Sequence, residues 1–358
     1  MRSREDAARK KLVVVGVDTH LELHVAVAID EVGQVLGTLE IPTTPRGFRQ
    51  LLKWATGFGP VVSFGVEGTG SYGAGLARFL LESGAAVVEV IRPNRQARRQ
   101  RGKCDPLDAE LAARSVLSGE ARACPKRGRA VEMIKALRVA RRSAVIGRAQ
   151  VINEMKALVV TAPPELRQLL RGLNNRELVA SAIRFRPGPV TSARAAVKLA
   201  LSILGRRFEE LSTEVDVLDR ELQQLTATTS PRLLALKGVG TDVAGALLVA
   251  AGASPERLRS EGSFAKLCGV APLPASSGKT VRHRLNRGGD RSANNALWRI
   301  AMVRMSSDPR TQAYVARRTQ QGLSKPEIVR CLKRYIAREV FAALTHRPSV
   351  TAVAAKAA

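Results

Sequence analysis

Short hydrophobic blocks alternate with turn residues along the first third of the chain. Blocks rich in Val, Ile and Leu predict strands at 12–17, 23–29, 35–41, 61–66 and 86–91. The segments between them predict helices at 45–56, 73–83 and about 106–118. This order is a three-strand meander followed by helix, strand, helix, strand and helix. It is the order of an α/β, ribonuclease-H-like fold, whereas a Rossmann half begins strand–helix–strand.

The middle of the chain has the pattern of long helices. Residues 129–160 mix arginines with apolar spacing, and "APPEL" at 162–166 interrupts them. After the Pro/Gly loop "RFRPGPV" at 184–190, a helical pattern runs over 191–228 with apolar residues three and four positions apart, at Leu201, Leu204, Phe208, Leu211, Val215, Leu218 and Leu222. Two such helices predict an antiparallel coiled-coil arm, and ordinary packing in a helical bundle is the alternative.

The last third is helical apart from a Gly-, Pro- and Ser-rich loop at 269–290. We therefore expect three domains, at 12–122, 129–228 and 229–348. A charged N-terminus and the absence of any stretch near 18 apolar residues predict a soluble, intracellular protein. The four cysteines are far apart, which favours reduced thiols in the cytoplasm over a disulfide frame or a zinc knuckle.

The net charge of the chain indicates that this α/β protein binds a polyanion. Lys and Arg total 58 against 31 Asp and Glu, giving a net charge of +27 and a pI near 11.2. Such an excess fits a nucleic-acid partner, and a basic but uninvolved surface is the alternative. Aromatic residues are only 4%, so contacts to phosphates should dominate over base stacking. One candidate contact is the basic run Arg92, Arg95, Arg98, Arg99, Arg101 and Lys103.

Four acids are the main candidates for chemistry. Asp18 and Glu67 end otherwise apolar strands, and Asp105 and Asp108 stand three residues apart at a predicted helix start. Buried charges are costly unless they are paired or bind a metal. A ribonuclease-H-like sheet places the first strand beside the fourth, so the four acids can converge and hold Mg²⁺. The alternative for the Asp pair is helix capping, with Asp105 as N-cap and Asp108 at N3.

A glycine-rich run after Glu67 offers a competing interpretation. Residues 68–73, "GTGSYG", match the dinucleotide fingerprint G-x-G-x-x-G, and the acidic Glu89 follows about 20 residues later. In the predicted strand order this fingerprint follows the fourth strand, whereas in a Rossmann fold it follows the first. We therefore interpret the glycines as a tight turn into the next helix and Glu67 as the functional residue.

The loop at 269–290 carries a second candidate site. Its "GKT" imitates the end of a phosphate-binding loop, but Leu273 stands where the first glycine is required. What remains is Ser276 and Ser277 before a glycine, followed by the cations Lys279, Arg282, Arg284, Arg287 and Arg291. A serine nucleophile beside phosphate-stabilising cations is chemically sensible, and a polar anion-binding loop is the alternative.

Two further motifs are weaker. "LLALKGVGTDVAGALLVA" resembles a helix-hairpin-helix, whose turn at Gly238 and Gly240 can hold a phosphate on backbone amides; a plain helical hairpin is the alternative. Residues 20–24 read H-x-E-x-H, not the H-E-x-x-H of zinc proteases, and strand alternation would put the three polar side chains on one side. We do not expect zinc there.

Taken in order, the motifs "GVDTH", "VEGTGSYG", "KCDPLDA", "KGVGTDVAGALL" and "FAKLCGVAPLPASSGK…RGGDRSANNALWRIAM" resemble the DEDD transposases of insertion sequences of the IS110 type. These are also called bridge-RNA-guided recombinases. The resemblance runs over about residues 12 to 345. It implies a RuvC-like catalytic domain, a coiled-coil arm and a helical C-terminal transposase domain with the helix-hairpin-helix.

The resemblance also assigns roles to residues. The DEDD set falls on Asp18, Glu67, Asp105 and Asp108 as Mg²⁺ ligands, and the catalytic serine falls on Ser277, with Ser276 as the alternative. In such proteins the serine attacks a DNA phosphate, and a structured non-coding RNA pairs with donor and target DNA. The resemblance further implies a homo-oligomer, dimer to tetramer, in the cytoplasm and associated with the nucleoid. Departures are small: Leu21 and Glu22 stand where a Lys often follows "DTH", and Pro106 separates the two Asp residues.

Three functions therefore stay open. The first is a serine- and Mg²⁺-dependent transposase, the second a RuvC-like junction nuclease that uses water as nucleophile. The third is a non-enzymatic basic nucleic-acid-binding protein. An oxidoreductase ranks below all three.

Overall fold

A computed structural model describes residues 12–90, 104–125, 128–252, 258–274, 283–284, 286 and 288–345. The chain divides into two compact units, an N-terminal unit of residues 1–127 and a C-terminal unit of residues 128–358. In the described part of the chain, no helix combines the length and the apolar character needed to cross a membrane.

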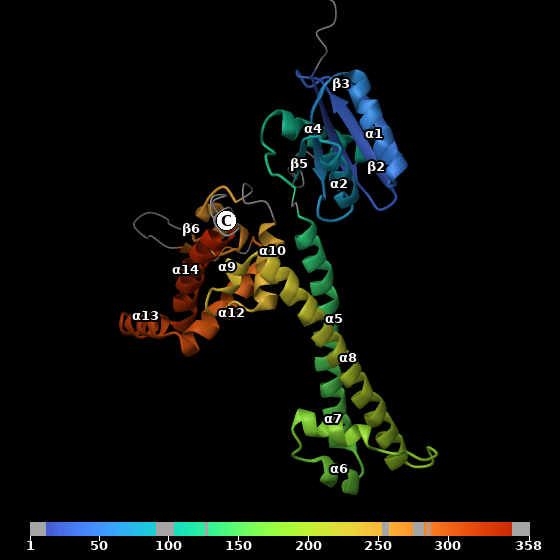
Figure 1. Cartoon of the computed structure of the whole chain (residues 1–358), viewed down its shortest axis with the longest axis vertical. Coiled ribbons are helices and arrows are strands. Elements are labelled where there is room, and N and C mark those ends of the chain that lie inside the picture. Colours follow the sequence, from blue (N-terminus) through green and yellow to red (C-terminus); the bar gives the residue numbers. More distant parts are fainter. Residues whose placement is uncertain are drawn as a thin grey trace, which may run out of the picture. The chain divides into compact units, whose positions relative to one another are not determined.

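The N-terminal unit is built on a five-stranded mixed sheet (Figure 1). Its strand order is β3-β2-β1-β4-β5, with β1 antiparallel to β2 and parallel to β4. The predicted strands and the predicted neighbourhood of the first and fourth strands are confirmed. Their bounds are Val13–Thr19 (β1), Leu23–Ile29 (β2), Val35–Pro42 (β3), Val61–Glu67 (β4) and Val87–Val90 (β5).

Helices cover both faces of this sheet. α1 (Pro45–Phe58) and α2 (Ala74–Glu82) bury Leu51 and Leu80 against one face, together with alternate residues of β1 and β4. α4 (Asp105–Leu117) packs Ala109 and Ala113 on the other face. Because strand side chains alternate in direction, each strand contributes to both layers. The unit is a three-layer α/β/α arrangement, as the predicted order requires.

Two long helices and two short ones begin the C-terminal unit (Figure 1). α5 (Arg129–Thr161) and α8 (Ala193–Thr229) lie side by side, and α6 (Pro164–Leu170) and α7 (Asn175–Ile183) connect them. Leu201 and Leu222 from the predicted apolar stripe are fully buried. Arg141 of α5 also donates two hydrogen bonds to Asp219 of α8. The long helices that the sequence predicts at 129–160 and 191–228 are confirmed.

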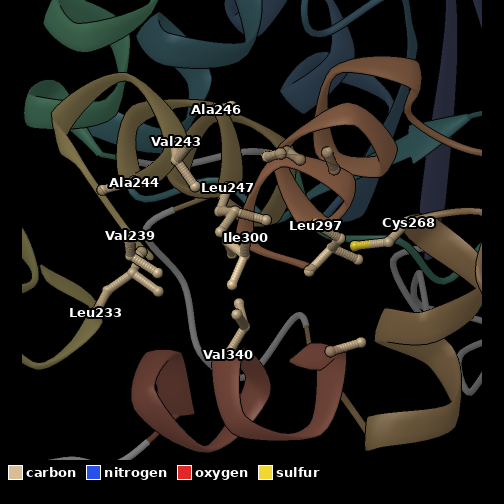
Figure 2. Close-up of a cluster of buried hydrophobic side chains, with 14 of the residues drawn as sticks. Leu233, Val239, Val243, Ala244, Ala246, Leu247, Cys268, Leu297, Ile300 and Val340 are labelled. Carbon is tan, nitrogen blue, oxygen red and sulfur yellow. The ribbon is translucent and has the colours of Figure 1, made fainter. Parts of the chain in front are cut away.

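The rest of the C-terminal unit is a helical core with one small hairpin. Buried Val239, Leu247, Leu297, Ile300 and Val340 meet at its centre, as Figure 2 shows. The elements are α9 (Pro231–Leu234), α10 (Thr241–Ala251), α11 (Glu261–Leu267), α12 (Arg291–Ser307), α13 (Pro309–Gln320) and α14 (Lys325–Thr345), with β6 (Leu273–Pro274) paired to β7 (His283–Arg284). The sequence predicts only a loop at 269–290, because two-residue strands are too short to show alternation.

Candidate active site

The site begins with two acids at the ends of neighbouring parallel strands. Val17 of β1 pairs with Val66 of β4, so Asp18 and Glu67 are the next residues on adjacent strands. Val17 and Val66 belong to the core under α1 and α2, so alternation directs Asp18 and Glu67 to the opposite, α4 face. Both acids are buried, with relative exposures of 7% and 8%. The predicted position of each acid at a strand end is confirmed.

Two glycines bring α4 onto this face. Gly16 and Gly65 are cross-strand partners, and each stands two residues before one of the acids. A Cβ on Gly16 would lie 2.0 Å from the Ala109 carbonyl oxygen, and one on Gly65 would lie 3.1 Å from that of Ala112. The helix backbone therefore lies directly against β1 at Gly16, where a side chain has no room, and closely against β4 at Gly65. The sequence analysis gives neither glycine a role, although Gly16 opens the motif "GVDTH" and both glycines stand two residues before an acid.

The first turn of α4 supplies the second pair of acids. Asp108 is 2% exposed, whereas Asp105 is partly exposed. The interpretation of Asp105 as N-cap is wrong, because Cys104 has the extended backbone of the N-cap (φ −147°, ψ 147°) and Asp105 is already helical. Asp108 is accordingly one position beyond N3. Neither acid is therefore the cap residue, although both lie in the first turn of α4, where acidic side chains are favourable.

A residue outside the predicted set, His20, joins the acids. Its Nε2 lies 3.1 Å from Asp18 Oδ2 and 3.5 Å from Asp105 Oδ1. One ligand atom from each of these three residues lies within 4.8 Å of the others, whereas Glu67 and Asp108 lie outside this close group. Because a carboxylate only accepts hydrogen bonds, Nε2 carries the proton when His20 bonds ionised Asp18.

The expected alternation of residues 20–24 is wrong, because residues 20–22 form the turn between β1 and β2. His24 is on β2 instead, fully buried and stacked on Phe48 with ring centroids 6.0 Å apart. Burial lowers the pKa of His24. His24 is thus a core residue, and the signal for His20 is its place two residues after Asp18.

The electrostatics of Asp18 indicate a site that needs positive charge. Burial raises the pKa of the Asp18 carboxyl; His20 opposes this effect, while the charges of Asp108 and Asp105 add to it. An ionised carboxylate in this position is unfavourable unless a cation compensates it. Carboxylate oxygens are the preferred ligands of hard divalent cations such as Mg²⁺, so the donor set fits such an ion.

The glycine run after β4 holds the end of that strand. Gly68 has a positive φ of 60°, and a Cβ on Gly73 would lie 2.5 Å from the Glu67 carbonyl oxygen. Thr19 Oγ1 donates to the same carbonyl at 3.0 Å. The run therefore folds back over Glu67 and fixes its backbone, as the tight-turn interpretation predicts.

Most of the predicted nucleophile and basic contacts lie outside the described residues. These are Arg92, Arg95, Arg98, Arg99, Arg101, Lys103, Ser276, Ser277, Lys279, Arg282, Arg287 and the side chain of Arg284. Arg291 is described and is the first residue of α12.

The predicted phosphate-binding turn at Gly238 and Gly240 is described. Gly238 has φ 84° and packs against α12, where a Cβ would lie 3.3 Å from the Ile300 carbonyl oxygen. Gly240 is the N-cap of α10. In the first turn of α10, Asp242 bonds Arg138 and Arg299, so a carboxylate already lies near the amides predicted to hold a phosphate.

Comparison with known proteins adds family evidence to this geometry. Residues 15–164 match a family model described as "Transposase", built on DEDD transposases of IS110 elements, and residues 230–316 match one described as "Transposase IS116/IS110/IS902 family". The chain is 30% identical over 116 residues to an uncharacterized 43.6 kDa protein of insertion element IS110 from Streptomyces coelicolor, covering 32% of this chain and 28% of that protein. It is 25% identical over 199 residues to a 42 kDa protein of insertion element IS900 from Mycobacterium paratuberculosis, covering 52% and 49%. The match thus spans about half, or less, of each relative.

Proposed function

This chain belongs to the IS110-type transposases, and we propose that it cleaves and joins DNA strands at a metal site built from Asp18, Glu67, Asp105 and Asp108. One observation carries the proposal: two buried strand-end acids and the first turn of α4 meet on one face of the sheet. Asp18, His20 and Asp105 each offer one ligand atom, and these atoms lie within 4.8 Å of one another, close enough to bind one cation. A site so rich in carboxylates suits phosphoryl transfer.

Asp18 and Asp105 would hold a divalent cation, with Glu67 and Asp108 completing the acidic surroundings. When bound, Mg²⁺ lowers the pKa of an attacking group and neutralises charge on the phosphate. The chain supplies rigidity: Gly16 and Gly65 fix α4, and Thr19 and Gly73 fix the end of β4. The acids are therefore held in place before substrate binds.

We assign the nucleophile to Ser277, with Ser276 as the alternative. Its Oγ attacks a DNA phosphorus; an Oγ–P bond forms as the bond to one deoxyribose oxygen breaks. The hydroxyl proton passes to water, and the leaving oxygen takes up a proton. A second DNA hydroxyl then attacks this phosphoserine: a new phosphodiester bond forms as the Oγ–P bond breaks, the attacking hydroxyl gives its proton to water, and the serine oxygen takes one up.

The proposal includes three domains: a RuvC-like domain at 12–122, a coiled-coil arm at 129–228 and a transposase domain at 229–348. It also includes a structured non-coding RNA that pairs with donor and target DNA, and a homo-oligomer. The excess of +27 with only 4% aromatic residues supports binding to phosphate backbones without an extensive surface for reading bases.

The first test is a search for a covalent adduct. Purified protein, Mg²⁺, RNA from the flank of the element and labelled junction DNA are mixed and resolved on a denaturing gel. We expect an adduct that disappears in Ser277→Ala and in Asp105→Asn and persists in Asp216→Asn, a control that changes an exposed acid of α8. An adduct lost only in Ser276→Ala would move the nucleophile by one residue.

Two outcomes favour the other functions. Strand cleavage that depends on Asp105 but leaves no adduct in any variant indicates the junction nuclease. Binding without cleavage, indifferent to EDTA and to the acids, indicates a non-enzymatic nucleic-acid-binding protein.

A further inference from the structure

A basic cleft opens in the C-terminal unit between α14 and the segment that leads into β6. Its volume is about 850 Å³. One wall is the α14 face that carries Arg330, Lys333, Arg334 and Arg338. The other is formed by residues 269–272 and by Asn294 of α12. None of these residues belongs to the acidic site of the N-terminal unit.

The cations of this cleft exceed its acids. Glu261 pairs with both Arg334 and Arg338. Glu327 accepts hydrogen bonds from the backbone and hydroxyl of Ser324. Four cations thus face two carboxylates, which leaves the charge of the cleft positive.

Lys333 is a cation of this cleft whose ammonium is half-buried. Burial lowers the pKa of its ammonium, and the nearby charge of Arg330 adds to the effect. Within the described part of the chain, no carboxylate lies at ion-pair distance from Lys333. A half-buried ammonium in this position is stabilised by an incoming anion.

The position of Lys333 is fixed in advance of any ligand. Its Nζ donates to Asn294 Oδ1 at 2.9 Å. Asn294 Nδ2 in turn donates to the carbonyl oxygens of Cys268 at 2.8 Å and Gly269 at 3.2 Å. An ammonium has three N–H donors, so two remain for a ligand. Lys333 is thereby tied to the backbone that continues through β6 toward Ser276 and Ser277.

We propose that this cleft binds the phosphodiester backbone of a nucleic acid, with Lys333 and Arg330 as its phosphate contacts. The inference rests on the proposed function and adds a binding site to it. Lys and Arg are the side chains that bind phosphate oxygens best. Tyr335 also lines the cleft, but Arg338 lies over its ring at 5.8 Å from the centroid. The cleft therefore favours backbone contacts over base stacking.

The test measures binding of the full chain, in EDTA, to labelled duplex DNA and to single-stranded RNA of equal length over a salt series. Each phosphate contact contributes about 0.9 to the slope of log affinity against log salt on duplex DNA and about 0.7 on a single strand. We expect Arg330→Gln and Lys333→Gln each to reduce the slope by about that amount, with a loss of about 5–10-fold in affinity at 0.1 M salt. Arg176→Gln, which removes an exposed arginine of α7, is the matched control and should change neither quantity.

The two probes identify the ligand. A reduced slope on DNA alone, on RNA alone or on both supports nucleic-acid binding by the cleft and shows which nucleic acid it binds. Unchanged slopes for both variants on both probes would overturn it. Arg330→Gln leaves the bond between Lys333 and Asn294 intact, so a folding defect in Lys333→Gln does not decide the question. Because the assay needs no cleavage, failure of the proposed chemistry would leave these slope changes in place.

Discussion

At the scale of single residues, Asp18 combines a structural cost with a functional role. Burial raises its pKa, which means that the ionised carboxylate is less stable in the folded protein than in the unfolded chain. At pH 7 without metal, this charge therefore opposes folding of the N-terminal unit. We expect Asp18→Asn to raise the melting temperature in EDTA by roughly 2–4 °C and to abolish the stabilisation that Mg²⁺ gives the parent protein.

The two tryptophans make this measurable one unit at a time. Trp54 is in the N-terminal unit and Trp298 in the C-terminal unit. In a Trp298→Phe background, the fluorescence of Trp54 follows the unit that contains Asp18. Asp216→Asn, which changes an exposed acid of α8, is the control and should leave both the melting temperature and the Mg²⁺ response unchanged. A Mg²⁺ response that survives in Asp18→Asn would exclude Asp18 as a ligand.

At the scale of elements, the close packing of α4 against Gly16 determines whether Asp105 and Asp108 lie near the acids of the sheet. A Cβ at this position would lie 2.0 Å from the Ala109 carbonyl oxygen and 2.3 Å from the Ala113 nitrogen, both helix backbone atoms that cannot move aside separately. Gly16→Ala should therefore displace α4 together with Asp105 and Asp108. We expect a loss of about 1–3 kcal/mol in unfolding free energy, and loss of the Mg²⁺ response under conditions where the variant remains folded.

Gly57→Ala is the matched control for that substitution. Gly57 is in α1 of the same unit, and a Cβ there would meet no atom within 4 Å. Alanine is the better helix former, so the variant should gain up to about 1 kcal/mol and keep its response to Mg²⁺. If Gly16→Ala behaved like Gly57→Ala, the close contact of α4 with β1 would not position the acids.

Three helices of the C-terminal unit are joined by one carboxylate, which makes their packing pH-dependent. Asp242 of α10 bonds Arg138 of α5 at 3.1 Å and Arg299 of α12 at 2.5 Å. Burial raises the pKa of Asp242, but the two arginines outweigh it and the net pKa is below its ordinary value of 3.8. A lowered folded pKa gives stability that is present above the unfolded pKa and lost as the pH falls through the folded one.

Asp242→Asn should accordingly cost about 1–3 kcal/mol of unfolding free energy at pH 7. The difference from the parent should shrink once the pH falls below about 3.8. Trp298, next to Arg299, reports the transition in a Trp54→Phe background. Glu214→Gln, an exposed acid of α8, should show no pH-dependent difference. A difference for Asp242→Asn that is the same at pH 3 and pH 7 would rule out charge as its origin.

Sequence alone predicts the elements of the N-terminal unit because its strands are largely apolar runs bounded by turn residues, and two of these runs, β1 and β4, carry an acid at the end. Asp18 and Glu67 are visible for that reason, and their meeting follows from the parallel pairing of β1 and β4. The place of His20 beside Asp18 is not predicted, because a turn rather than a strand sets the direction of its side chain. The start of α4 is displaced by one residue, since Cys104 has no capping side chain to mark it. The role of Ser277 stays a prediction, because it lies outside the described residues.

At the scale of the whole molecule, most of the net positive charge and the acidic site lie in different units. Residues 1–127 hold 19 basic and 14 acidic residues, a net charge of +5, whereas residues 128–358 hold 39 and 17, a net charge of +22. The acidic site is in the first unit and the basic cleft in the second. We infer that binding to nucleic acid and response to metal reside mainly in different units.

Separate expression of residues 1–127 and 128–358 tests this division. Each unit has its own buried clusters, so each fragment should unfold cooperatively. The first fragment should be stabilised by Mg²⁺, and Asp18→Asn should remove that effect. The second should retain most of the salt-dependent affinity of the full chain for nucleic acid, whereas neither should cleave DNA. Mg²⁺-dependent stabilisation of the second fragment alone would place the metal site outside the acids of β1, β4 and α4. It would thereby contradict the assignment of Asp18, Glu67, Asp105 and Asp108 as the metal site.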